Sequence, residues 1–139
     1  IILKKKIESV INAGLIPIYC IGEDINIKRK DKTKNHLLRQ LLNTLPKKNK
    51  NKIIIAYEPI WSIGTGNTPT VNEIEDVNLY IKKIITKINL SYEKTSILYG
   101  GSVNKRNSLV FLDNKNIDGL LIGGASLNLN TFSSILTYK

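Results

Sequence analysis

The sequence predicts an α/β protein built on a parallel sheet, and three observations support this class. Four short apolar runs alternate with longer segments of helical periodicity along the 139 residues. These runs are apolar at nearly every position, which is typical of parallel strands that are buried on both faces. Three of the runs end alike, in YEP (57–59), YGGS (99–102) and IGGAS (122–126). The length suits a single domain with a core of its own.

The first part of the chain predicts a helix, a strand, a second helix and a second strand. A helix is expected over 1–13, where apolar residues recur at helical spacing and Gly14 provides the end. The run LIPIYCIG (15–22) predicts a buried strand. A helix over 33–45 is expected next, followed by a strand in KIIIAYEP (52–59). The residues expected on the buried helical faces are Ile7, Val10, Ile11, Leu37, Leu38, Leu41 and Leu42.

The second part repeats the alternation. The longest helix is expected over 70–88, because its isoleucines form one continuous stripe. Strands are expected over 96–101 and 118–124, each followed by a helix, over 104–112 and 128–138. For the longest helix, Thr70 or Asn72 is the expected cap, and Ile74, Val77, Ile81, Ile84 and Ile85 form the stripe.

The charge of the protein raises the question of a nucleic-acid partner. The formal net charge is +10, from 21 Lys and Arg against 11 Asp and Glu. The basic residues are interspersed with Asn and Ile, without aromatic residues among them. This pattern favours a solvated surface, so a basic scaffold that binds nucleic acid is the least favoured of three hypotheses.

Cysteine use and hydropathy exclude other classes. Cys20 is the only cysteine, so neither a disulfide within this sequence nor a paired-cysteine metal site can form, and a reducing compartment fits. No apolar run reaches the length of a membrane span, and no signal-peptide pattern opens the sequence.

The strand ends predict a binding site. In a βα architecture the site forms at the carboxyl ends of the strands, so Glu58, the 100–102 turn and the 123–124 turn should face one pocket. Glycines there let several backbone N–H groups approach a phosphate, and a helix that starts just after them adds a favourable dipole. For a single Gly pair, a tight turn without a ligand is the alternative. Two pairs and a Gly-x-Gly loop favour phosphate binding.

Three segments of the chain resemble a known family. AYEPIWSIGTGNTPT (56–70), ILYGGSV (97–103) and DGLLIGGASL (118–127) resemble the three carboxyl-terminal signature segments of the triosephosphate isomerase family. AGLIPIYCIGE (13–23) resembles the fifth strand of that family, and the resemblance covers essentially the whole chain. It implies a (β/α)8 TIM barrel, of which residues 1–139 are the carboxyl-terminal half of a single domain, since a full barrel needs about 250 residues.

The resemblance also implies a function. The expected reaction interconverts dihydroxyacetone phosphate and D-glyceraldehyde 3-phosphate through an enediol(ate), in glycolysis and gluconeogenesis. It implies a cytoplasmic homodimer that uses no cofactor or metal and has no membrane or specific nucleic-acid partner. Matched to the family's motifs, Glu58 is the expected catalytic base. The expected phosphate-binding residues are Gly64, Ser102, Gly123 and Gly124.

The segment after Glu58 matches the family's lid, a loop that closes over the substrate in triosephosphate isomerases. The lid residues are Pro59, Ile60, Trp61, Ser62, Ile63, Gly64, Thr65, Gly66, Asn67, Thr68 and Pro69. Tyr99 and Ser102 match the positions at which the closed lid finds hydrogen-bond partners. Glu23 matches a residue that the family places near the lid tryptophan, here Trp61.

Some positions depart from the family's pattern. The second lid hinge reads Asn67-Thr68-Pro69 where the family usually has Lys-Thr-Ala, so altered lid kinetics are expected. Lys82 and Asn116 are expected to replace the arginine and aspartate of a common ion pair, which would then be absent. Cys20 is expected to be a small packed residue in a buried strand.

The family's catalytic lysine and histidine belong to segments that precede strand five. The single histidine, His36, falls on an expected surface helix and is not given that role. The 139 residues alone are therefore expected to be inactive or nearly so, with the apolar faces of the outer strands exposed. The second hypothesis is a non-catalytic phosphosugar-binding half-barrel, which would self-associate to close a barrel.

Overall fold

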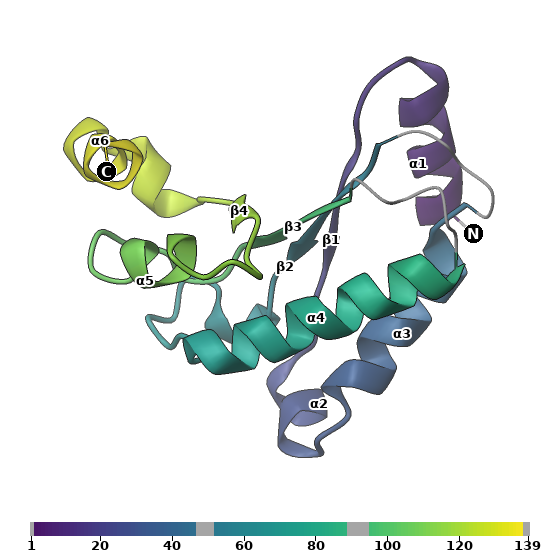
Figure 1. Ribbon diagram of the computed structural model, residues 1–139, viewed down its shortest axis with the longest axis horizontal. Coiled ribbons are helices and arrows are strands. Elements are labelled where there is room, and N and C mark those ends of the chain that lie inside the picture. The colour runs from purple at the N-terminus through teal and green to yellow at the C-terminus, as the bar shows by residue number, and fades with distance from the viewer. Residues whose placement is uncertain (1, 47–51, 89–94, 138–139) are drawn as a thin grey trace.

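A computed structural model describes residues 2–46, 52–88 and 95–137, and four parallel strands form its centre (Figure 1). The strands are β1 (Ile18–Ile21), β2 (Ile54–Tyr57), β3 (Ser96–Tyr99) and β4 (Gly119–Leu120), in the spatial order β1-β2-β3-β4. Tyr57 is in register with Ile21 on one side and with Tyr99 on the other. The carboxyl ends of these three strands are therefore level, and the predicted parallel α/β sheet is confirmed.

Helices separate the strands. The α-helices are α1 (Ile2–Asn12), α2 (Ile25–Arg29), α3 (Thr33–Thr44), α4 (Val71–Ile88), α5 (Ser108–Leu112) and α6 (Leu129–Leu136), with short 3-10 helices η1 (Ile60–Ser62) and η3 (Gly124–Leu127). All five predicted helices are confirmed, with shorter bounds at several ends. Helix α2 was not predicted from the sequence. Its signal was Asp24, whose carboxylate accepts hydrogen bonds from the N–H groups of Asn26 and Ile27 as an N-cap does.

One face of the sheet forms the core. Side chains of β1, β2 and β3 that point to this face pack with the apolar stripes of α3 and α4, which lie side by side (Figure 1). These buried residues are Tyr19, Ile21, Ile55, Tyr57, Ile97 and Tyr99 in the strands, with Leu37, Leu41, Ile74 and Ile81 in the helices. The buried stripe predicted for α4 is confirmed at all five positions. On α3, Leu42 is exposed instead, at the edge of the stripe.

The opposite face of the sheet is open at β1. Ile18 keeps 49% of its surface exposed, and Cys20 is exposed as well. The prediction that Cys20 is a buried packed residue is therefore wrong for this chain. The reason is alternation along the strand: Tyr19 and Ile21 face the helices, so Ile18 and Cys20 face the side that no described helix covers. The expectation of an exposed apolar strand face is met at β1.

The expected loss of an ion pair at Lys82 is also wrong. Lys82 Nζ lies 3.2 Å from Asp118 Oδ1, and Asp118 Oδ2 accepts a hydrogen bond of 2.7 Å from the Ile97 N–H. Asn116 instead donates to Glu75 of α4 at 2.7 Å. Asp118 directly precedes β4, so its carboxylate reaches both β3 and α4. Asn116 lies two residues earlier, in the turn that faces the start of α4.

Candidate active site

Glu58 follows β2 directly and is half-buried. Its N–H donates to the Ile21 carbonyl at 2.7 Å, so the pairing with β1 continues to this residue. Its side chain lies over Gly100, at the end of the neighbouring strand. A Cβ at position 100 would lie 2.6 Å from Glu58 Cγ and 2.9 Å from Oε1. The first glycine of YGGS therefore provides the space that the Glu58 carboxylate occupies.

We expect Gly100→Ala to displace the Glu58 side chain, because the added methyl group meets it at less than van der Waals distance. In the full-length chain, kcat for the reaction proposed below should fall by about tenfold or more, since misplacing a reacting group by about 1 Å can cost about 10²-fold. Steady-state kinetics and a melting temperature measure the two effects separately. A kcat equal to that of the parent, in a protein that melts normally, would contradict this role.

Cys20 lies beside Glu58, a contact that was not predicted from the sequence. Partial desolvation of the thiol, followed by the hydrogen bond and the negative charge of Glu58, raises the pKa of Cys20 to about 11. At neutral pH Cys20 is therefore an uncharged thiol next to the carboxylate and is not a reactive thiolate.

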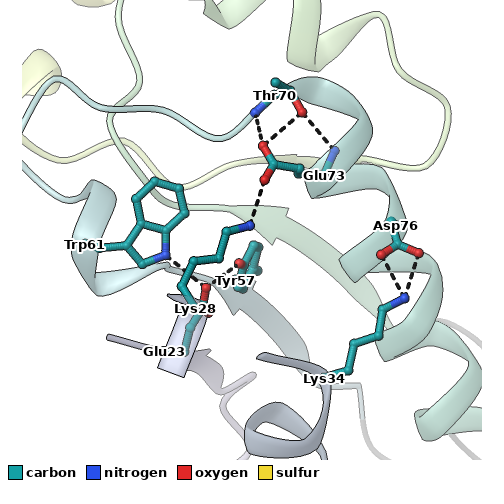
Figure 2. Close-up of polar contacts among 8 residues, drawn as sticks. All are labelled: Glu23, Lys28, Lys34, Tyr57, Trp61, Thr70, Glu73 and Asp76. Atoms are coloured by element: carbon teal, nitrogen blue, oxygen red, sulfur yellow. Dashed lines mark hydrogen bonds and ion pairs between the residues drawn. The ribbon is translucent and has the colours of Figure 1, made fainter. Parts of the chain in front are cut away.

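The first hinge of the lid, residues 59–61 by the family resemblance, is held by Glu23 (Figure 2). Glu23 is fully buried, and its Oε1 accepts hydrogen bonds from Trp61 Nε1 at 2.9 Å and from the Tyr57 hydroxyl at 3.1 Å. The backbone carbonyl of Glu23 also accepts from the Ile60 N–H at 3.0 Å. Burial and then the nearby charge of Glu23 raise the pKa of Tyr57, so its hydroxyl remains a donor. The structure thus brings Glu23 and Trp61 together.

The middle of the lid contacts the end of β3 through Ser62, which is buried. Its Oγ donates to the Asn67 carbonyl at 2.6 Å and lies 3.3 Å from the Tyr99 hydroxyl and from the Ser102 N. The Ser102 hydroxyl donates to the Ser62 carbonyl. Both residues that the family resemblance implicates as lid partners therefore meet the lid at Ser62.

The second glycine of YGGS also has a spacing role. A Cβ on Gly101 would lie 2.2 Å from the Tyr99 hydroxyl and 2.8 Å from Ser62 Oγ. Only glycine at position 101 leaves room for the contact between the Tyr99 hydroxyl and Ser62 Oγ. The N–H and hydroxyl of Ser102 both bond to Ser62 in this conformation. Both polar groups of Ser102 are therefore occupied by the lid in this conformation.

The tip of the lid is exposed and turns at its glycines. Gly64 and Gly66 have φ values of +68° and +77°, a region that side chains rarely adopt. Thr65 Oγ1 accepts from the Asn67 N–H at 3.2 Å and lies 3.1 Å from the Trp61 carbonyl, to which it donates. The exposed lid residues are Ile60, Ile63, Gly64, Thr65, Gly66, Asn67 and Thr68, whereas Pro59 and Pro69 at its two ends are buried.

The glycine pair after β4 is exposed, and a Cβ at either position would meet no atom within 4 Å. The short helix η3 starts at Gly124, with Gly123 as its cap. The expected longer helix, α6, starts five residues after Gly124, and Asn128 Oδ1 caps it by accepting from the Thr131 N–H at 3.0 Å. The predicted helix over 128–138 is therefore confirmed from residue 129, and the helix that starts at the glycines themselves is the short η3.

Several other groups lie outside this site. His36 is on α3 and lines a surface pocket of about 300 Å³ with Ile27, Lys32, Asn35 and Arg39. Within the described residues, no three His, Cys, Asp or Glu side chains are grouped so that they could hold a metal ion. Among the same residues, no helix is both long enough and apolar enough to cross a membrane.

Glu58 and the two glycine turns lie at the carboxyl-terminal edge of a parallel βα sheet. The βα-barrel enzymes build their active sites at this same edge. The family profile described as triosephosphate isomerase matches residues 1–139. The chain belongs to the triosephosphate isomerase family.

Individual relatives agree with this assignment. The triosephosphate isomerases of Dictyoglomus thermophilum and Dehalococcoides mccartyi are 42% and 43% identical to the chain over 139 and 136 residues. Each alignment covers 96% of this chain, but only 56% and 54% of those proteins. The crystal structure of triosephosphate isomerase from Bartonella henselae matches with a TM-score of 0.85 at 33% identity, over 96% of this chain and 55% of that one. The chain therefore spans about half the length of the curated relatives that it matches, and its sheet corresponds to part of a TIM barrel.

Proposed function

We propose that this chain supplies the carboxyl-terminal half of a triosephosphate isomerase, which interconverts dihydroxyacetone phosphate and D-glyceraldehyde 3-phosphate. One observation carries the proposal. The Glu58 carboxylate stands at the carboxyl end of β2 over Gly100, and the loop that follows it is tied to β1 through Glu23 and to β3 through Tyr99 and Ser102. This arrangement supports a role for Glu58 as the base and for the loop as its cover at one strand end.

In the proposed reaction, Glu58 removes a proton from the carbon beside the substrate carbonyl. The enediol(ate) that forms takes the proton back at the neighbouring carbon, so Glu58 ends the cycle unprotonated. A carboxylate suits this task because expulsion of water by a closing lid disfavours the charged form and raises its basicity. Cys20, a neutral thiol beside Glu58, adds no competing charge.

The phosphate group of the substrate is assigned to Gly64, Ser102, Gly123 and Gly124. Gly123 and Gly124 are exposed and have open space around their Cα atoms, which allows an anion to approach the backbone. Ser102 must first exchange its contacts with Ser62 for contacts with phosphate. Substrate binding and lid position are coupled in this scheme through that exchange.

The remaining catalytic groups, the family's lysine and histidine, would come from the part of the barrel that precedes this chain. A homodimer and a cytoplasmic role in glycolysis and gluconeogenesis belong to the same proposal. The test compares a full-length polypeptide with the 139-residue chain, with each assayed for isomerisation of dihydroxyacetone phosphate and for exchange of substrate hydrogen with deuterium oxide. Activity and exchange are expected only in the full-length polypeptide. A full-length polypeptide that shows neither would overturn the proposal.

A second candidate is a non-catalytic half-barrel that binds phosphosugars and pairs with a second copy. The exposed apolar residues at β1, Leu15, Ile16 and Ile18, favour it because they would be covered by such pairing. Under this hypothesis, the 139-residue chain forms a stable dimer that binds a triose phosphate without turnover. Sedimentation and isothermal titration with dihydroxyacetone phosphate decide between the two.

Pro69 gives a separate prediction about the lid. It is buried between the exposed lid tip and Thr70, which caps α4, and its ring restricts the hinge backbone. We expect Pro69→Ala to change kcat and KM together by about two- to fivefold, because hinge substitutions alter lid opening and closing. Pro17→Ala, at a buried proline before β1, serves as the matched control. Steady-state constants identical to those of the parent would show that Pro69 does not govern the hinge.

A further inference from the structure

A cationic side chain lies between the two ends of the lid (Figure 2). Lys28 belongs to α2, the short helix that Asp24 caps one residue after Glu23. The Lys28 N–H donates to the Asp24 carbonyl at 3.1 Å, which sets the side chain one helical turn beyond the cap. The same stretch of chain that anchors Trp61 through Glu23 therefore also positions Lys28.

Lys28 reaches both flanks of the lid. Its Nζ lies 5.5 Å from the centre of the Trp61 ring, within the range of a cation–π interaction. The same Nζ donates to Glu73 Oε1 at 2.7 Å. Trp61 is in the first hinge, and Glu73 is in the first turn of α4, which begins directly after the second hinge.

Glu73 transmits the contact to the second hinge. Its Oε2 accepts from the Thr70 N–H at 2.8 Å and from the Thr70 hydroxyl at 3.0 Å, and its own N–H donates to Thr70 Oγ1 at 3.2 Å. This reciprocal pair is a capping box, and it confirms Thr70 as the cap of α4. Hydrogen bonds from Lys28, and then from Thr70, lower the pKa of Glu73 to about 2, so the carboxylate is charged at neutral pH.

We propose that Lys28 is a positioning residue for the lid, which acts by joining Trp61 at the first hinge to the Glu73–Thr70 capping box at the second. The proposal rests on the proposed isomerase function, since it assigns a role to the lid of that site. Lys28 and Glu73 are both partly exposed, and exposed ion pairs contribute little to global stability. A lid equilibrium is different, because its states are separated by a small free energy that one such contact can shift.

The structure provides an internal control for this proposal (Figure 2). Lys34 on α3 pairs with Asp76 on α4 at 2.8 Å and lies 5.6 Å from the Tyr80 ring centre. Lys28 and Lys34 therefore each pair with a carboxylate of α4 and lie over an aromatic ring, and both line one cavity of about 260 Å³. Lys34 contacts Asp76 and Tyr80, neither of which belongs to the lid.

The experiment uses the full-length protein labelled with 5-fluorotryptophan, and fluorine NMR identifies the Trp61 signal by its loss in Trp61→Phe. Lys28→Met removes the charge, Lys28→Arg keeps it, and Glu73→Gln removes the ion pair while retaining a side chain that can cap Thr70. We expect Lys28→Met and Glu73→Gln to move or broaden the Trp61 signal, and Lys28→Arg to restore it. A loss of lid closure should lower kcat/KM by about two- to fivefold, as expected for one contact of this strength.

Lys34→Met is expected to leave the Trp61 signal and kcat/KM unchanged, with a melting temperature close to that of Lys28→Met. An unchanged Trp61 signal in Lys28→Met would overturn the proposal, and so would an equal change in Lys34→Met. The fluorine signal is read without substrate. If the parent protein lacks isomerase activity, the proposed function fails while the signal still decides the role of Lys28.

Discussion

Glu58→Gln in the full-length polypeptide is expected to lower kcat by between about 10²-fold and 10⁴-fold, the contribution of a positioned acid–base group. The amide has nearly the same size as the carboxylate, so it fits the space over Gly100 without new strain. It cannot accept the substrate proton at neutral pH. KM should therefore change much less than kcat. Steady-state kinetics with dihydroxyacetone phosphate, together with deuterium exchange, measures the loss of proton transfer directly.

The matched control is Glu75→Gln on α4. Glu75 accepts hydrogen bonds from Asn114 and Asn116, and it lies outside the site. This variant should retain the kcat of the parent. More than about a tenth of parental kcat in Glu58→Gln would exclude Glu58 as the base, since even a modest acid–base contribution is about 10²-fold.

Gly22→Ala should have the largest effect on stability. A Cβ at this position would lie 1.8 Å from the Glu58 carbonyl oxygen and 2.5 Å from its carbon, and these are backbone atoms. Gln40 of α3 also holds Gly22 in place, since its Oε1 accepts from the Gly22 N–H at 3.1 Å and its Nε2 donates to the Gly22 carbonyl at 3.1 Å. Neither β1, which Gly22 follows, nor β2, which Glu58 follows, can therefore move apart easily to admit the methyl group. The free energy of unfolding should fall by about 3 kcal/mol or more, at the upper end of overpacking costs.

Urea unfolding of the full-length protein measures this change, with Gly124→Ala as the control. An added methyl group at position 124 meets no atom within 4 Å, so its effect on stability should be small. Equal unfolding free energies for the two variants would show that β1 and β2 can separate to accept a side chain. The Gly22 variant should also be less active, because the clash falls on the backbone that carries Glu58.

Local patterns were sufficient for much of the fold. The stripe of α4 and the apolar run of β2 depend on periodicity within a few residues, and both are confirmed. The site was predictable to the level of segments, because YEP and YGGS each end a strand. The roles assigned to individual residues in the reaction remain predictions.

Errors arose where a residue depends on a distant partner. Asp118, rather than Asn116, pairs with Lys82, since strand register decides which side chain reaches α4. Cys20 faces the open side of β1 because of the way the strand is set against α3 and α4. Nothing in the neighbouring sequence distinguishes these outcomes.

The sequence by itself determined the α/β class, the helical faces and the segments that carry Glu58 and the lid, because these follow from local spacing and residue type. Only the tertiary structure decided why the glycines are required. Gly22, Gly100 and Gly101 leave space for Glu58, Tyr99 and Ser62, atoms brought close by the pairing of three strands. The same applies to Lys28, whose contacts with Trp61 and Glu73 join residues 33 and 45 positions apart. Such distances are set by how the elements pack, and a local pattern does not contain them.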